Sequence, residues 1–114
     1  MSPITTHVLD TTLGKPGRGI AVVVEIGLDD GSWTELACGV TDGDGRIAQF
    51  SPPLKAPKPG LYRVRFFTAA YFTAMQVRGF YPEVDVIVQI DEPDQHYHIP
   101  LLLSPFGYST YRGS

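Results

Sequence analysis

Short runs of alternating apolar and polar residues recur along this chain, and they predict β-strands. Successive side chains of a strand point to opposite faces of a sheet, so each such run buries one face and exposes the other. The predicted strands are residues 4–10, 20–26, 33–41, 46–50, 61–67, 84–90, 96–103 and 108–112. Turns rich in glycine, proline and aspartate separate many of them, which favours an all-β fold, an eight-stranded antiparallel β-sandwich.

Two segments interrupt the strand pattern. Residues 68–77 are rich in alanine and aromatic residues, with Tyr71, Phe72 and Met75 at a spacing of three to four. We therefore expect one short helix there, ended by Gly79. Residues 51–60 contain four prolines, which cannot donate a backbone hydrogen bond to a sheet, so this stretch is predicted to be a loop.

The predicted strand at residues 96–103 has one apolar face and one mixed face. The apolar face, which we expect to cover the core, carries Tyr97, Ile99, Leu101 and Leu103. The outward face carries His96, His98, Pro100 and Leu102. His7 belongs to the early strand and would join the two histidines if that strand lies alongside. The three imidazoles would then form a polar floor on one side of a sheet.

Size, charge and cysteine content narrow the range of functions. A chain of 114 residues suits one domain, spanning 1–114, with a single core. The net charge of −3, with lysine and arginine scattered, disfavours nucleic acid and membrane partners. No apolar stretch approaches the roughly 20 residues of a membrane helix. A single cysteine, Cys38, and a start without signal-peptide character lead us to expect a cytoplasmic location.

Several sequence motifs, taken in order, carry a resemblance to a known family. These motifs are His7–Asp10, Gly14–Pro16, Thr41–Arg46, Phe80–Val84, His96–Pro105 and Tyr108–Ser114. In this order they resemble the 5-hydroxyisourate hydrolases, the transthyretin-like enzymes of urate breakdown. The resemblance spans the whole chain. Its most specific element is the final Tyr111-Arg112-Gly113-Ser114, because true transthyretins share the sandwich but lack that ending and the histidines.

The resemblance implies a fold, an assembly and an activity. The fold is a single transthyretin-like (prealbumin-like) domain, an eight-stranded sandwich with one short helix. The assembly is a homotetramer with its active sites in a channel at the dimer–dimer interface, which would cover the outward Pro100 and Leu102. The activity is hydrolysis of 5-hydroxyisourate to 2-oxo-4-hydroxy-4-carboxy-5-ureidoimidazoline, without a metal or cofactor.

The resemblance also places His7, Arg46 and His98 in the catalytic site. Ring-amide hydrolysis requires a base for water, a donor for the developing oxyanion and a proton for the leaving nitrogen. Histidine titrates near neutral pH and serves as base or acid, whereas arginine keeps its proton and presents a fixed fork of donors. We expect His98 or His7 to be the base, the other histidine to be the acid, and Arg46 to clamp the substrate and its oxyanion.

The remaining expected site residues bind substrate or support the histidines. His7 and Arg46 also count as substrate-binding residues, together with Tyr111, which would limit the depth of the pocket, and Ser114, which offers a hydroxyl or the terminal carboxylate. His96 and Arg112 are expected at supporting positions.

Three alternatives follow from the same residues. The three histidines also suit a zinc site with an open fourth position, but no carboxylate stands in an obvious supporting position. A transthyretin-like carrier of small aromatic ligands, without catalysis, is the second alternative, and the bulky Tyr111 disfavours its open channel. A plain adhesion or scaffolding sandwich is the third, and the polar residues gathered at strand ends disfavour it.

Overall fold

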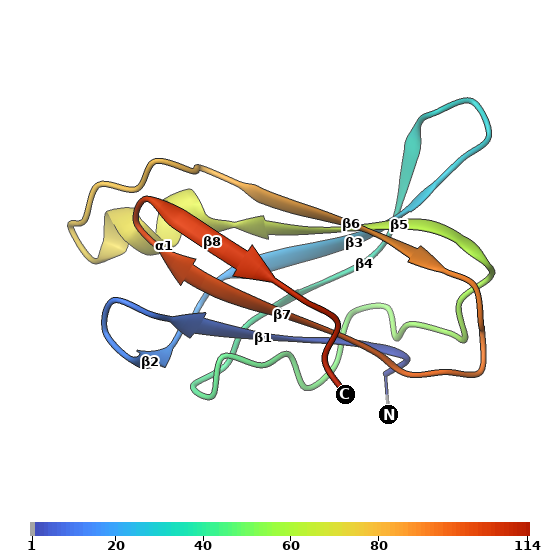
Figure 1. The fold of residues 1–114 in the computed structure, drawn as a ribbon, viewed down its shortest axis with the longest axis horizontal. Coiled ribbons are helices and arrows are strands. Elements are labelled where there is room, and N and C mark those ends of the chain that lie inside the picture. The colour runs from blue at the N-terminus through green and yellow to red at the C-terminus, as the bar shows by residue number, and fades with distance from the viewer. Residues whose placement is uncertain (1) are drawn as a thin grey trace.

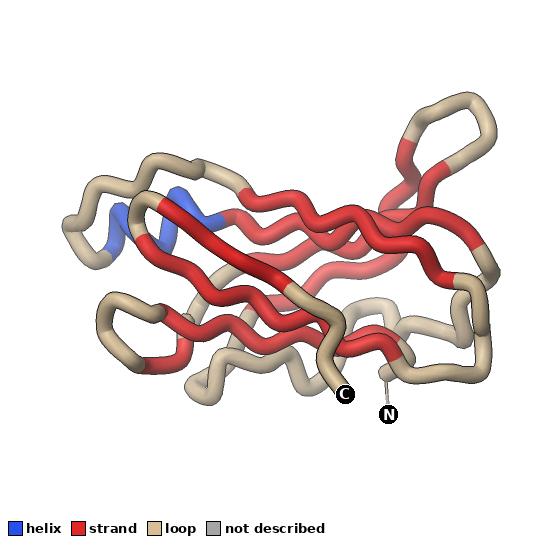
Figure 2. Tube along the Cα trace, in the orientation of Figure 1, coloured by secondary structure: helices blue, strands red, loops and turns tan. Residues whose placement is uncertain are grey.

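A computed structural model describes residues 2–114, which form two four-stranded sheets around one shared core (Figure 1). The elements are β1 (Ile4–Asp10), β2 (Lys15–Pro16), β3 (Ala21–Gly27), β4 (Trp33–Val40), β5 (Gly60–Phe67), α1 (Thr68–Ala74), β6 (Val84–Ile90), β7 (Tyr97–Ser104) and β8 (Gly107–Thr110). One sheet has the order β2-β1-β7-β8 and the other β4-β3-β5-β6. Strands dominate, and α1 lies at one end of the sandwich (Figure 2).

The predicted transthyretin-like sandwich with one short helix is therefore confirmed, with two differences in its strands. One pairing, β1 with β7, is parallel instead of antiparallel. The predicted strand at residues 46–50 is wrong, since this segment makes only a single bridge, between Arg46 and His7. Its apolar residues have another explanation: Ile47 and Phe50 are buried in the core although the segment is a loop. The eighth strand is instead β2, which pairs with the end of β1.

Several predicted boundaries also shift by one or more residues. His96 precedes β7, and Tyr111 follows the end of β8, so neither belongs to a strand. The helix ends at Ala74, before Gly79, because Gln76 takes a positive φ of 56° that no α-helix accommodates. The chain then turns back, and the N–H of Val77 donates to the carbonyl of Phe72 at 2.9 Å.

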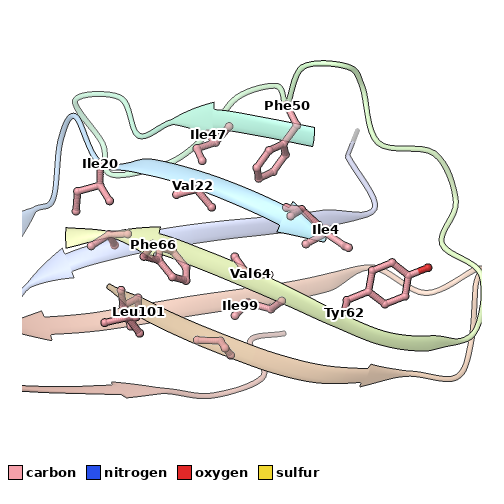
Figure 3. Close-up of a cluster of buried hydrophobic side chains, with 14 of the residues drawn as sticks. Ile4, Ile20, Val22, Ile47, Phe50, Tyr62, Val64, Phe66, Ile99 and Leu101 are labelled. Carbon is pink, nitrogen blue, oxygen red and sulfur yellow. The ribbon is translucent and has the colours of Figure 1, made fainter. Parts of the chain in front are cut away.

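The core lies between the sheets and takes the faces that alternation predicts. Tyr97, Ile99, Leu101 and Leu103 of β7 are all buried. Figure 3 shows Ile99 and Leu101 among the side chains of the opposite sheet, including Val64 and Phe66. Burying an aliphatic or phenyl side chain contributes roughly 1.5–3 kcal/mol. This core therefore holds β7 in register, and the residues between these four point outward, away from the core. No helix within residues 2–114 is long and apolar enough to cross a membrane.

A buried carboxylate joins the end of β1 to the helix. Asp10 is only 2% exposed, and its Oδ1 accepts the N–H groups of Thr12 and Leu13, each at 3.0 Å. Its Oδ2 accepts the hydroxyl of Tyr71 in α1 at 2.7 Å. Burial, and next the hydrogen bond to Asp10, raise the pKa of Tyr71 well above its ordinary value, so the phenol remains a donor.

Removing that donor should weaken the sandwich. In Tyr71→Phe the buried carboxylate loses one partner, and we expect the free energy of unfolding to fall by roughly 1.5–3 kcal/mol, as for hydrogen bonds to charged groups. Urea unfolding followed by fluorescence at fixed protein concentration measures the change. Tyr108→Phe is the control, because among the described residues the Tyr108 hydroxyl has no hydrogen-bond partner and its ring alone packs, on Tyr81. Equal losses in both variants would contradict the role of Asp10.

Candidate active site

The parallel pairing of β1 with β7 creates a polar area on the outer face of the sheet. Thr5 lies opposite His98, and His7 opposite Pro100. Paired residues on neighbouring strands share a face, and the alternating burial of β1 turns Thr5 and His7 away from the core. The early strand thus lies directly beside the late one, and His7 joins the face that carries His98. Pro100 is already buried within the chain, so Leu102 is the more accessible apolar residue beside them.

The Asp42–Arg46 turn brings Arg46 to this face. The Asp42 carboxylate accepts the N–H groups of Asp44 and Arg46, and the N–H of Gly45 donates to the Asp42 carbonyl at 2.9 Å. Gly45 has a φ of +76°, and a Cβ there would overlap the carbonyl oxygen of Val8. Only glycine lets this turn approach β1 so closely. The next residue, Arg46, consequently lies beside His7.

An open groove of about 490 Å³ lies where these segments meet. Its polar lining residues are Thr5, Thr6, Asp42, Arg46, His96, His98 and Ser114. They come from β1, from the turn after β4, from the start of β7 and from the C-terminus. Among the described residues, Arg46 forms no ion pair with a carboxylate, so its guanidinium is available to an anionic or carbonyl-rich ligand.

His98 is held from two sides. Its Nδ1 lies 2.8 Å from the hydroxyl oxygen of Thr5. The backbone N–H of Gly113 donates to the His98 carbonyl at 2.8 Å, and a Cβ on Gly113 would overlap the imidazole. Within residues 2–114 no protein group hydrogen-bonds to Nε2, so this nitrogen remains free for a ligand or water.

The surroundings favour the neutral form of His98. Burial, and then the positive charges of Arg46, His96 and His7, lower the pKa of His98 below its ordinary value of about 6.5. A neutral imidazole at pH 7 can accept a proton, which a general base must do. The same lowered pKa means that the unfolded chain binds the proton more readily. His98 therefore reduces the stability of the fold as the pH falls below about 6.5, and has no such effect above it.

Two predicted residues lie in a second groove. Tyr111 and Arg112 line a hollow of about 340 Å³ beside β6. His98 lines both this hollow and the first groove. Tyr111 is 59% exposed. Arg112 donates to Gln95 at 2.8 Å and its guanidinium lies 4.6 Å from the ring centre of Tyr97. Within one chain, therefore, Ser114 joins His98 and Arg46 in the first groove, whereas Tyr111 and Arg112 do not. His7 shares the outer face and bridges to Arg46 but is not among the residues that line this groove.

Two residues that contact the histidines were not expected from the sequence. Thr5 hydrogen-bonds to both His96 and His98, and Gly113 packs against the His98 ring. Thr5 stands two positions before His7 and hence on the same strand face, so its place beside the histidines could have been predicted from the sequence. The contact of Gly113 depends on the path of the chain after β8, which no local pattern reveals.

The histidines do not converge as a metal site would require. Across the described part of the chain, no three His, Cys, Asp or Glu side chains come close enough together to hold a metal ion. The rings of His96 and His98 are nearly parallel, at 22°, with their centres 6.5 Å apart. Nε2 of His96 and Nδ1 of His98 both hydrogen-bond to the Thr5 hydroxyl.

Comparison with known proteins places this geometry in a family context. The family model of the HIUase/Transthyretin family matches residues 4–113. The 5-hydroxyisourate hydrolase of Salmonella dublin is 50% identical over 111 residues, which cover 97% of this chain and 80% of the relative. The structure of Klebsiella pneumoniae 5-hydroxyisourate hydrolase is 34% identical, with a TM-score of 0.80 and coverage of 100% and 94%. Sea bream transthyretin in complex with thyroxine is 35% identical, with a TM-score of 0.88 and coverage of 97% and 94%.

The lowered pKa of His98 can be tested directly. We expect its imidazole to titrate below about 6.5, and the midpoint to rise in Arg46→Gln because a neighbouring positive charge is lost. Burial remains, so the rise should be partial. NMR titration of the ring protons, assigned with His98→Asn, gives the midpoint. Arg18→Gln, which neutralises an arginine in an exposed loop, should leave the midpoint unchanged. A wild-type midpoint at or above 6.5 would contradict the assignment.

Proposed function

We propose that this chain, which belongs to the HIUase/Transthyretin family, is a hydrolase that converts 5-hydroxyisourate to 2-oxo-4-hydroxy-4-carboxy-5-ureidoimidazoline in urate degradation. One observation carries the proposal for the site. His98, Arg46 and Ser114, from three separate segments, line a single groove. We propose that residues 1–114 act as one domain and that the reaction needs no metal or cofactor.

The reaction adds water across the ring amide of the substrate. The water oxygen bonds to the carbonyl carbon, the ring C–N bond breaks, and a carboxylic acid and an N–H group result. The acid then releases its proton to the solvent and becomes a carboxylate. The enzyme must take a proton from water, stabilise the negative charge on the carbonyl oxygen and return a proton to the nitrogen.

Arg46 suits the stabilising role. Its guanidinium is permanently charged, and its planar fork of donors can engage two acceptors of a carbonyl-rich ring at once. Because it lines the groove without a carboxylate partner among the described residues, it need not break an ion pair to bind substrate.

His98 suits the role of base for water, and His7 that of proton donor. The lowered pKa keeps His98 neutral near pH 7, and its Nε2 has no protein partner among the described residues. His7 shares the outer face two positions from Thr5 and bridges to Arg46 through the backbone. Ser114, with its hydroxyl or terminal carboxylate, would contact the substrate beside them, and His96 would support His98.

Assembly would complete the site. We propose a cytoplasmic homotetramer with active sites at the dimer–dimer interface, acting on a small molecule and on neither nucleic acid nor membranes. Leu9 and Leu102 are register partners on the outer face and are only partly buried. Tyr111 is exposed, and in the assembly it would close the channel over the substrate; Arg112 would hold the C-terminal segment against Gln95 and Tyr97.

Non-catalytic ligand carriage is the less supported alternative. Fold similarity does not separate the two, because the sea bream transthyretin has a TM-score of 0.88 and the Klebsiella pneumoniae hydrolase 0.80. The chemistry of the groove favours the hydrolase, because a neutral imidazole and a free guanidinium in one groove serve proton transfer rather than passive binding of an aromatic ligand.

Activity is tested with 5-hydroxyisourate formed in place from urate by urate oxidase. The protein should accelerate the ultraviolet decay of this compound, and His98→Asn should lower turnover by on the order of 10²-fold or more, because the titrating nitrogen is lost. Arg46→Lys should also reduce it, since a point charge cannot reproduce the fork. Arg18→Lys, in an exposed loop, is the matched control. No acceleration by the wild type would overturn the proposed function; folded His98→Asn and Arg46→Lys with full turnover would overturn the assigned site.

Assembly is tested by mass. Analytical ultracentrifugation at micromolar concentration should give about four times the 12.5 kDa chain mass. Leu102→Arg places a charge on the outer face and should break the tetramer and reduce turnover. The matched Leu61→Arg replaces an exposed leucine of the other sheet and should do neither. A monomer with full activity would refute this assembly.

A further inference from the structure

The hydroxyl of Thr5 lies between two imidazoles. Its Oγ1 is 2.8 Å from Nδ1 of His98 and 3.0 Å from Nε2 of His96. Other threonines on this sheet use their hydroxyls differently, since Thr6 and Thr110 donate to the backbone carbonyls of Ile99 and Pro100. Thr5 has only ring nitrogens as partners among the described residues, which points to a role in the histidine pair rather than in strand pairing.

Counting protons shows what this arrangement requires. A hydroxyl has one proton to donate, and a neutral imidazole carries one N–H. The Thr5 oxygen could accept from both rings, but its own proton would then have no partner among the described residues. When that proton is also used, Thr5 donates to one ring and accepts from the other. The tautomers of His96 and His98 are consequently linked through a single oxygen.

Two arrangements form both hydrogen bonds and also use the Thr5 proton. In the first, Thr5 donates to Nδ1 of His98, so the neutral ring carries its proton on Nε2, the nitrogen without a protein partner among the described residues. In the second, His98 donates its Nδ1–H to Thr5, and Thr5 donates to Nε2 of His96. Only the second leaves a lone pair on Nε2 of His98 that can take a proton from water.

The second arrangement also persists through the chemical step. When Nε2 accepts the proton from water, the resulting imidazolium still carries Nδ1–H and still donates it to Thr5. No other proton has to move, and the Thr5 oxygen faces the new positive charge. The first arrangement cannot take part in this step without first moving a proton from Nε2.

We propose that Thr5 is a positioning residue that orients His98 as a base, by accepting its Nδ1–H and donating its own proton to His96. This inference rests on the proposed hydrolase function. It gives His96 a role as hydrogen-bond acceptor for Thr5 that needs no contact with the substrate, and it makes the hydroxyl, rather than the methyl group, the functional part of Thr5.

Nitrogen NMR tests the wild-type protein without any substitution. Two-dimensional ¹H–¹⁵N spectra of the ring nitrogens at pH 8 report which nitrogen of each neutral histidine bears the proton. We expect the proton of His98 on Nδ1 and that of His96 also on Nδ1, leaving Nε2 of His96 as the acceptor. A His98 proton found on Nε2 would overturn the proposal.

Substitutions test the hydroxyl. Thr5→Val keeps the shape but lacks the donor and acceptor, so we expect kcat to fall by about 10-fold or more with KM nearly unchanged, and both tautomers of His98 to appear. Thr5→Ser restores the hydroxyl and should restore kcat to within about threefold. Thr11→Val is the matched control, because its hydroxyl donates to the Leu103 carbonyl at the far end of the same strand pair. Wild-type kcat and an unchanged His98 tautomer in Thr5→Val would overturn the proposal.

His96 variants show whether His96 acts by accepting the Thr5 hydrogen bond or only by packing. His96→Gln offers an amide oxygen to the Thr5 proton and should retain most of kcat. His96→Leu offers no acceptor, so Thr5 turns its proton toward His98, and kcat should fall as Nε2–H becomes the main tautomer. Equal kcat in the two variants would overturn the proposed role of the Thr5–His96 hydrogen bond. If the wild-type chain did not hydrolyse 5-hydroxyisourate, the proposed function would fail separately, and the NMR spectra would still test the tautomer link.

Discussion

A parallel register between β1 and β7 places Thr5 beside His98, across a sequence separation of 93 residues. Closing so long a loop costs conformational entropy, and the buried faces of the two strands offset this cost by packing Ile4, Val8, Ile99 and Leu101 into the core. Slipping the register by one residue would turn every apolar side chain of one strand outward. The core therefore fixes the positions of the outer-face residues, although it does not touch them.

Among residues 2–114, the Asp42–Arg46 turn supplies the one arginine that lines the groove, and it does so through backbone contact rather than through a strand. Gly45 approaches the carbonyl of Val8 so closely that no side chain fits between them, and the N–H of Val8 donates to the Gly45 carbonyl at 2.8 Å. Beyond Arg46, Ile47 and Phe50 are buried in the core and anchor the loop. The backbone of Arg46 is thus held by contacts on both sides of it in sequence, which places its charged side chain at the groove without an ion pair to a carboxylate among the described residues.

The scaffold itself is compatible with more than one function. A transthyretin crystallised with thyroxine and a 5-hydroxyisourate hydrolase both superpose well on this chain, so the arrangement of strands does not select between them. The groups proposed to act on the substrate lie on one outer face and at the C-terminus: the imidazoles, the guanidinium and the terminal serine. The hydroxyl of Thr5 hydrogen-bonds to two of these groups, the imidazoles of His96 and His98, and so couples the positions of their ring protons.

The alternation of residues by itself determined the class of the fold, the inward face of β7 and the grouping of His96 with His98, because side-chain direction along an extended chain follows from a period of two. The motifs determined the family. Tertiary structure alone decided three further things: the parallel β1–β7 pair, the loop at residues 46–50 and the contact of Gly113 with the His98 ring. It also placed Tyr111 and Arg112 in a different groove from Ser114 within the chain. Each of these depends on which segments meet across long stretches of sequence, and the energy that selects such contacts comes from the whole core rather than from any local pattern.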